Sequence, residues 1–156
     1  MTALALSVGD PSGIGPEIAI AAFLAREAAG LPAFYLLADP ALIASRASQM
    51  GLSVPIVETT PVQAAQVFAH TLPIVPLAAP FIDSPGRPDP ANAAGTVEAI
   101  DRAVAACLAG DAAAVVTCPI AKKPLYDAGF RFPGHTEYLA HLAARHSGVE
   151  AMPVMM

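Results

Sequence analysis

Short apolar runs alternate with helix-start signals along this chain, and this alternation is the feature that most constrains its fold. Residues 4–8 and 33–38 form apolar runs of strand length, and a proline that suits a helix start, Pro16 or Pro40, follows each run. Proline is favoured in the first turn of a helix, where its missing N–H is not needed. Strands that alternate with helices predict a largely parallel sheet. The predicted fold class is therefore α/β, with a mostly parallel sheet and helices on both faces.

The rest of the chain continues this pattern. Further strands are expected over residues 54–57, at a sheet edge because of Pro55, and over 112–118, buried on both faces. Residues 72–77 are a weaker strand candidate, because six prolines between Pro73 and Pro90 indicate a long loop or crossover at about 73–90. Helices are expected over residues 16–29, 40–50, 61–69, 90–109 and 137–146.

The clearest helical pattern is that of residues 90–109. Val97, Ile100, Val104, Cys107 and Leu108 recur there at the three-and-four spacing of one buried helix face. Gly110 follows as the end signal. We therefore expect these larger apolar side chains to pack against the sheet.

Composition restricts the class of protein. The 156 residues suffice for one domain, and 55% of them are hydrophobic while 13% are charged. Charges, glycines and prolines interrupt every apolar run before the length of a membrane helix, and the N-terminus lacks the basic segment of a secretory signal. A cytoplasmic protein with no membrane partner is expected. The net charge of −5 and the lack of a basic run argue against a nucleic-acid partner and favour a small substrate.

The two cysteines do not indicate a metal site. Cys107 and Cys118 lie far from any metal-ligand spacing, and each lies in an apolar run. We expect two free, buried thiols.

Three segments follow predicted strands or open predicted helices, where ligands of parallel α/β sheets collect. The first, SVGDPSGIGPEI, contains Asp10, Gly13 and Gly15, but it carries neither the dinucleotide nor the P-loop fingerprint. Its glycines permit close backbone approach, and the following helix start offers free amides to an anion. A purely structural turn and a ligand loop are both consistent with this segment.

The second and third segments add charge and hydrogen-bond donors. Lys122 and Lys123, the only lysines of the chain, directly follow the strand expected at 112–118, where they could hold a phosphate or carboxylate, or remain solvated. Further on, Thr136 can cap the next helix through its hydroxyl, and His135 lies beside the exposed amides. This third segment is either an anion site or a plain helix cap with a neighbouring histidine.

The segments GDPSGIGPEI, TCPIAK and PGHTEYLA, in this order, resemble the N-terminal half of the 4-hydroxythreonine-4-phosphate dehydrogenase family. The resemblance runs from about Leu6 to Met156. The first segment is also similar to the GDGIGPE turn of isopropylmalate and isocitrate dehydrogenases, whose fold this family shares. The resemblance thus implies that residues 1–156 are the N-terminal portion of a longer two-domain dehydrogenase. The apolar run at 149–156, which looks like the start of a strand, fits that expectation.

The resemblance implies an NAD-dependent oxidation and decarboxylation of 4-phosphooxy-threonine to 3-amino-2-oxopropyl phosphate, in pyridoxal phosphate (vitamin B6) biosynthesis. It also implies a divalent metal (zinc, magnesium or cobalt) and a homodimer with its active site at the subunit interface. The family's metal ligands and most of its NAD contacts are expected downstream of this chain. No catalytic or metal-binding residue is therefore assigned here, and the 156 residues alone are expected to be inactive.

The resemblance assigns roles only to residues that match its motifs. His135 and Thr136 correspond to the substrate-binding histidine and threonine of the GHTE motif. Lys122 matches the lysine of the TCPIAK-like segment, whereas Ala121 stands where the family usually has Asn. The first loop is expected to shape the floor of the cleft between domains, with its glycines serving close backbone packing.

Two other functions compete with this one. Paralogous dehydrogenases with the same motifs oxidise 4-phosphoerythronate or 4-phosphothreonate in sugar-acid catabolism, and a substrate panel would separate them. The other possibility is an inactive fragment that binds an anion or dimerises. Phosphorylated-ligand binding without turnover would favour that second alternative.

Overall fold

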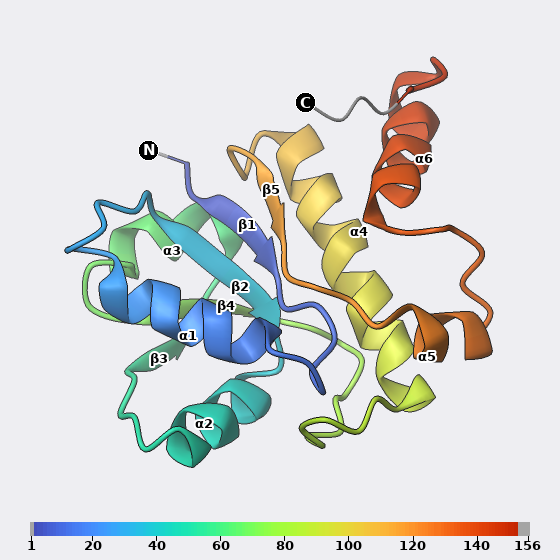
Figure 1. Cartoon of the computed structure of the whole chain (residues 1–156). Coiled ribbons are helices and arrows are strands. Elements are labelled where there is room, and N and C mark those ends of the chain that lie inside the picture. The colour runs from blue at the N-terminus through green and yellow to red at the C-terminus, as the bar shows by residue number, and fades with distance from the viewer. Residues whose placement is uncertain (1, 153–156) are drawn as a thin grey trace.

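A five-stranded parallel sheet forms the centre of the computed structural model, which describes residues 2–152 (Figure 1). Its strands are β1 (Leu4–Ser7), β2 (Phe34–Ala38), β3 (Ile56–Glu58), β4 (Leu72–Pro76) and β5 (Val115–Thr117). The order across the sheet is β3-β4-β2-β1-β5, and every neighbouring pair is parallel. The α/β class predicted from the sequence is confirmed.

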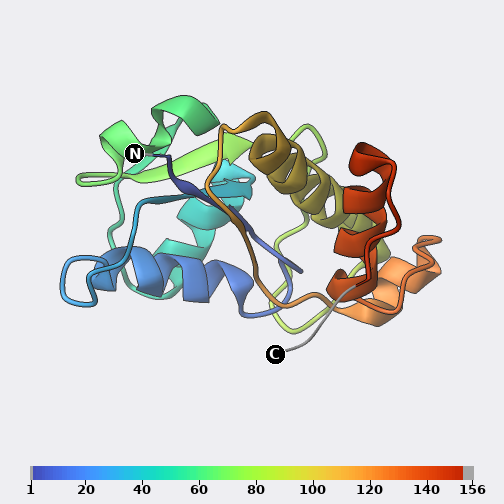
Figure 2. The ribbon, with the colours of Figure 1, turned by 90° about the horizontal axis from the view of Figure 1, so that it is seen from above.

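Helices cover both faces of this sheet, as Figure 2 shows from above. Helices α1 (Gly15–Ala25) and α2 (Pro40–Gln49) pack on one face, and α3 (Pro61–Val67) and α4 (Ala93–Ala109) pack on the other. A 3-10 turn, η1 (Pro90–Asn92), leads into α4, and α5 (Lys122–Asp127) and α6 (His135–Ser147) follow β5. Helix α6 lies beside α4 in both views.

Strand β2 separates two apolar cores. All five of its residues are buried, because it is the middle strand of the sheet and helices cover both of its faces. Phe34, Leu36 and Ala38 belong to the core under α1 and α2, whereas Tyr35 and Leu37 belong to the core under α3 and α4. Alternate side chains of a strand point to opposite faces, so a continuous apolar run is what this position requires.

The helix predicted over 90–109 is confirmed, but its expected buried face is only partly right: Ile100 is buried and Cys107 packs against the core, whereas the other predicted residues are not buried. The buried residues of α4 are mostly small, and Ala99, Ala103 and Ala106 belong to the core between this helix and the sheet. Val97 and Val104 are only half-buried and Leu108 is 43% exposed. Small side chains let a helix approach a sheet closely, and this close approach leaves the larger residues at the margin of the interface.

The weaker strand candidate at 72–77 is confirmed as β4 (Leu72–Pro76) inside the sheet, so the loop or crossover predicted from Pro73 begins later than expected. The Leu72 N–H donates to the Pro55 carbonyl, on the side of β3. Because successive backbone amides of a strand point to opposite sides, the nitrogen of Pro76 also points toward β3, whereas that of Pro73 points toward β2. The registers pair β3 only with Leu72–Ile74 and β2 only with Ile74–Pro76. Pro73 thus faces β2 where β2 is not paired with β4, and Pro76 faces β3 where β3 is not paired with it. Neither missing N–H removes a hydrogen bond from the sheet.

Three further features differ from expectation: the burial of one strand, the end of one helix and the structure after residue 148. Strand β5 is an edge strand, and Val116 is 43% exposed, so it is not buried on both faces. Helix α1 ends at Ala25, before the predicted residue 29. Residues 149–152 form no strand, and the rest of the predicted strand start at 153–156 lies outside the described residues. The edge position predicted for the strand after Pro55 is confirmed by β3.

Both thiols are free, and Cys118 is buried while Cys107 is half-buried. Burial raises the pKa of the Cys118 thiol to about 11, so it remains protonated at neutral pH. Within residues 2–152, no helix has the length and apolar character needed to cross a membrane.

The close contact of α4 with the sheet gives a stability prediction. Replacing Ala103, which is fully buried, with Leu should lower the free energy of unfolding by about 2 kcal/mol, because the added carbons overpack the interface. Ala105→Leu on the exposed side of the same helix is the matched control and should change it by less than about 0.5 kcal/mol. Urea unfolding measures the free energy of unfolding of both variants. Equal losses for Ala103→Leu and Ala105→Leu would contradict the packing of α4 on the sheet.

Candidate functional site

The loop after β1 and the segment after β5 meet at one end of the sheet. The Asp10 N–H donates to the Pro119 carbonyl at 3.0 Å. Gly9 has a φ of +75°, and a Cβ on this residue would lie 2.3 Å from the same carbonyl oxygen. The first two segments singled out in the sequence therefore pack directly against each other.

Gly15 also serves backbone packing. A Cβ on Gly15 would stand 2.1 Å from the Val8 carbonyl oxygen and 3.0 Å from the Cβ of Cys118. The start of α1 thus lies too close to β1 and to the segment after β5 for any side chain. This agrees with the expectation that the glycines serve packing more than a dinucleotide fingerprint.

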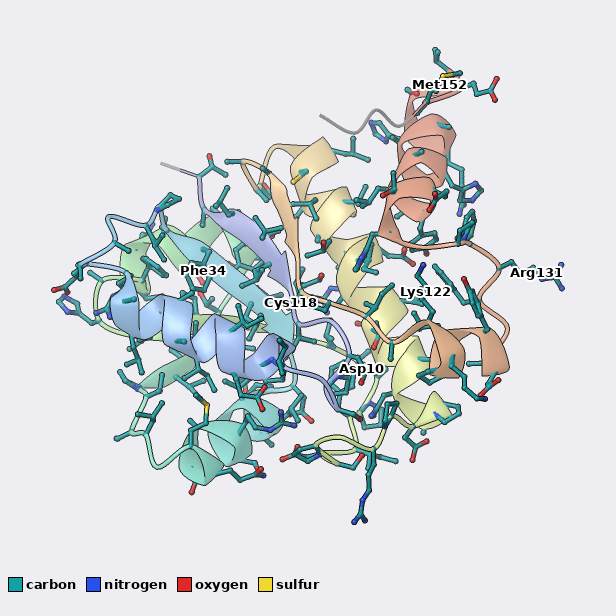
Figure 3. All side chains as sticks on the ribbon, viewed as in Figure 1. Asp10, Phe34, Cys118, Lys122, Arg131 and Met152 are labelled. Atoms are coloured by element: carbon teal, nitrogen blue, oxygen red, sulfur yellow. The ribbon has the colours of Figure 1, made fainter. Side chains whose placement is uncertain are left out.

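Asp10 is buried at the centre of this loop, with only 5% of its surface exposed. Its Oδ1 accepts a hydrogen bond from the Ser12 N–H at 2.8 Å, which closes a tight turn. Asp10 also lines a small cavity together with Asp89, Thr96 and Ala121, the residue before Lys122. Figure 3 shows Asp10 and Lys122 on these two neighbouring segments.

A buried arginine fixes the shape of the loop. Arg46 on α2 is 1% exposed, and its Nη2 donates to the Pro11 carbonyl at 2.7 Å while its Nη1 donates to the Gly13 carbonyl at 3.3 Å. The same two nitrogens form ion pairs of 2.6 Å with Glu17 of α1 and Asp83 of the proline-rich segment. One guanidinium thus connects two helices and two loops.

The electrostatics of this cluster favour its charged forms. Burial opposes ionisation of Asp83, but hydrogen bonds from Arg46, Ser45 and Gln49 outweigh it and hold the pKa of the Asp83 carboxyl below its ordinary value.

Sequence reasoning missed Arg46. One sequence feature pointed to a long-range partner: this arginine has no acidic residue three or four positions away on its own helix, so it cannot form an ion pair within that helix.

The third segment forms the N-terminus of α6. The helix begins at His135 after the N-cap Gly134, and no side chain caps it. The prediction that Thr136 caps the helix through its hydroxyl is therefore wrong, because Thr136 lies inside the first turn. The first amides of a helix have no partner within it, so this terminus can receive an anion.

Lys122 lies beside this open terminus. A Cβ on Gly134 would stand 4.0 Å from the Nζ of Lys122, 3.8 Å from its Cε and 3.6 Å from Oε2 of Glu137. Gly134 therefore leaves the space between the ammonium group and the helix start free of a side chain. The structure brings the lysine of the second segment and the helix of the third segment to one place.

His135 is half-buried, and its Nε2 is a buried nitrogen without a hydrogen-bond partner among the described residues. Burial lowers the pKa of this imidazole below its ordinary value, so His135 is neutral at pH 7. A neutral imidazole can donate one hydrogen bond and accept another. His135 does not line the cavity of Asp10, so these two predicted site residues do not share one cavity.

No metal centre can be built from the part of the chain that the structure describes. Residues 2–152 contain no group of three or more His, Cys, Asp and Glu residues arranged to hold a metal ion. Gly9 and Gly15 of the first loop are used for close contacts with the segment after β5 and with the end of β1. The described site brings together the Lys122 ammonium group, the Glu137 carboxylate and the free amides at the start of α6.

The family model described as pyridoxal phosphate biosynthetic protein PdxA matches residues 31–156. A 4-hydroxythreonine-4-phosphate dehydrogenase of Methylorubrum extorquens is 52% identical over 155 residues, which cover 98% of this chain and 44% of that protein. The chain therefore spans about half the length of the curated relatives that it matches.

Solved structures share the fold. A 4-hydroxythreonine-4-phosphate dehydrogenase from Burkholderia phymatum superposes with a TM-score of 0.83 at 23% identity, over 92% of this chain and 44% of that one. The corresponding enzyme from Klebsiella pneumoniae gives a TM-score of 0.75 at 28% identity, over 91% of this chain and 44% of that one. The isocitrate/isopropylmalate dehydrogenase-like fold implied by the sequence is thus confirmed.

The Arg46 cluster gives a prediction about pH. The pKa of Asp83 in the folded protein lies below its ordinary 3.8, so the Asp83 ion pair stabilises the fold fully above that pH and is lost as the pH falls through the folded-state pKa. Asp83→Asn should therefore lower the free energy of unfolding by about 2 kcal/mol at pH 7, and by progressively less below pH 3.8.

The matched control is Asp127→Asn, which removes an exposed ion pair with Lys123. Such pairs contribute little, so this variant should unfold almost like the parent protein at every pH. Urea unfolding across the acidic range up to neutral pH measures both variants. A loss for Asp83→Asn that does not change with pH would contradict the assignment.

Proposed function

Because the chain belongs to the family of pyridoxal phosphate biosynthetic protein PdxA, we propose that it supplies the substrate-binding part of a 4-hydroxythreonine-4-phosphate dehydrogenase. The observation that carries this proposal is the open N-terminus of α6, where Lys122 lies beside the helix start that bears His135 and Thr136. Positive charge and free amides at one place suit the phosphate group of such a substrate.

Each residue has a distinct part in this binding site. Lys122 acts as a point charge toward the substrate phosphate, and the first amides of α6 donate hydrogen bonds to its oxygens. His135, half-buried and neutral at pH 7, is assigned a hydrogen bond to a hydroxyl or phosphate oxygen through its imidazole ring. Thr136 adds an exposed hydroxyl in the same turn.

The reaction proposed for the whole enzyme is oxidation of the substrate's secondary alcohol with loss of carbon dioxide, which yields 3-amino-2-oxopropyl phosphate. NAD as the oxidant, a divalent metal and a homodimer in the cytoplasm belong to this proposal, and the family resemblance supports them. Residues 2–152 offer no cluster of metal ligands, so the role proposed for this chain is to bind and orient the phosphorylated substrate.

The first test is a histidine variant. His135→Ala should weaken binding of 4-phosphooxy-threonine to this chain about tenfold, because the site loses a hydrogen bond to a charged group. His146→Ala, an exposed histidine at the other end of the same helix, is the matched control and should leave the affinity unchanged. Isothermal titration calorimetry at pH 7 measures both.

A ligand panel completes this test. 4-Hydroxythreonine without its phosphate should bind at least about tenfold more weakly than the phosphorylated compound, since Lys122 and the amides of α6 would lose their partner. Equal binding of the two ligands, or an unchanged affinity for His135→Ala, would remove this site from the proposed function. 4-Phosphoerythronate belongs in the same panel, to measure selectivity among phosphorylated acids.

A further inference from the structure

Helix α6 packs on α4, and one of its residues is buried. Tyr138 is the buried side chain of this helix, with 7% of its surface exposed. Its hydroxyl donates a hydrogen bond to Oδ1 of Asp101 on α4. Among the described residues, this is the one side-chain hydrogen bond that joins α6 to another helix.

An aromatic cluster fixes the orientation of the Tyr138 ring. Phe130 and Phe132, from the loop before α6, lie with their ring centroids 5.0 and 4.9 Å from that of Tyr138. The Phe130 ring meets Tyr138 edge to face, at an interplanar angle of 77°. These contacts hold the ring so that its hydroxyl reaches α4.

The anchor and the site lie on the same part of the helix. Tyr138 follows His135 by three positions, so the two residues are neighbours on one face, a single turn apart. A change in the tilt of α6 about Tyr138 would therefore move His135, Thr136 and the free amides together. Lys122 belongs to a different helix, α5, so such a tilt would change its distance from the α6 terminus.

We propose that Tyr138 is a positioning residue, which through its hydrogen bond to Asp101 sets the N-terminus of α6 at the right distance from Lys122 for both to bind one phosphate. This inference rests on the proposed function, because it takes the α6 terminus as the phosphate site. Tyr138 itself touches neither the phosphate nor Lys122. Asp101, half-buried on α4, connects the site to the helix that packs on the sheet.

The test separates the hydroxyl from the ring. Tyr138→Phe keeps the aromatic cluster but removes the donor, and it should raise the Kd for 4-phosphooxy-threonine about tenfold. Asp101→Leu should have a similar effect, whereas Asp101→Asn retains an acceptor oxygen and should restore most of the affinity. Tyr35→Phe is the matched control, because Tyr35 is fully buried in a core without a hydrogen-bond partner for its hydroxyl.

A second readout distinguishes positioning from general destabilisation. In two-dimensional ¹⁵N NMR spectra, Tyr138→Phe should shift the amide signals of Thr136 and Glu137 while the signals of β1 and β2 stay unchanged. If Tyr138→Phe does not fold, the comparison of Asp101→Leu with Asp101→Asn carries the test. The aspartate variants keep the ring cluster intact, so they need not affect the fold.

The controls separate this inference from the proposed function. If His135→Ala and Lys122→Ala leave the affinity unchanged, the phosphate site is wrong and the inference fails with it. If those two variants weaken binding while Tyr138→Phe and Asp101→Leu do not, the site stands and the positioning role is wrong. Weakening by all four variants, with rescue by Asp101→Asn, supports both.

Discussion

The Arg46 guanidinium is the interaction on which the arrangement of the site depends. It is buried, and it is neutralised by Glu17 and Asp83, while two loop carbonyls accept further hydrogen bonds from it. A buried charge without such partners would be strongly unfavourable, so the loop, α1 and the proline-rich segment must all be in place for the protein to be stable. The glycine loop is therefore ordered by packing and charge before any ligand arrives, and its backbone is in turn what meets Pro119.

The two parts of the proposed site, Lys122 and the start of α6, are held in place in different ways. Lys122 follows a strand end that is fixed by the sheet and by the close contacts of Gly9 and Gly15. His135 and Thr136 belong to a helix that packs on α4, and the Tyr138 hydroxyl donates a hydrogen bond to Asp101 of that helix. The small residues of α4, which bring it close to the sheet, thus also set the distance at which α6 can stand from Lys122.

Local signals predicted the fold well where one segment determined its own structure. Aspartate and proline at positions 39 and 40 predicted the start of α2, and the buried run at 33–38 predicted the central strand. Long-range features escaped prediction. The prolines of β4 are compatible with a strand inside the sheet only because of where β2 and β3 pair with it. The two carboxylates that pair with Arg46 lie 29 and 37 positions away in the sequence. Lys122 and His135 were found from strand and helix ends, but the absence of a Thr136 cap depends on where α6 begins.

A crystal structure of this chain with 4-phosphooxy-threonine bound tests the central claim most directly. The account predicts that the phosphate lies between the Lys122 ammonium group and the first amides of α6, within hydrogen-bond distance of both and beside His135. Arg46 should keep its four partners in that structure. A phosphate bound elsewhere, away from the N-terminus of α6, would contradict the account.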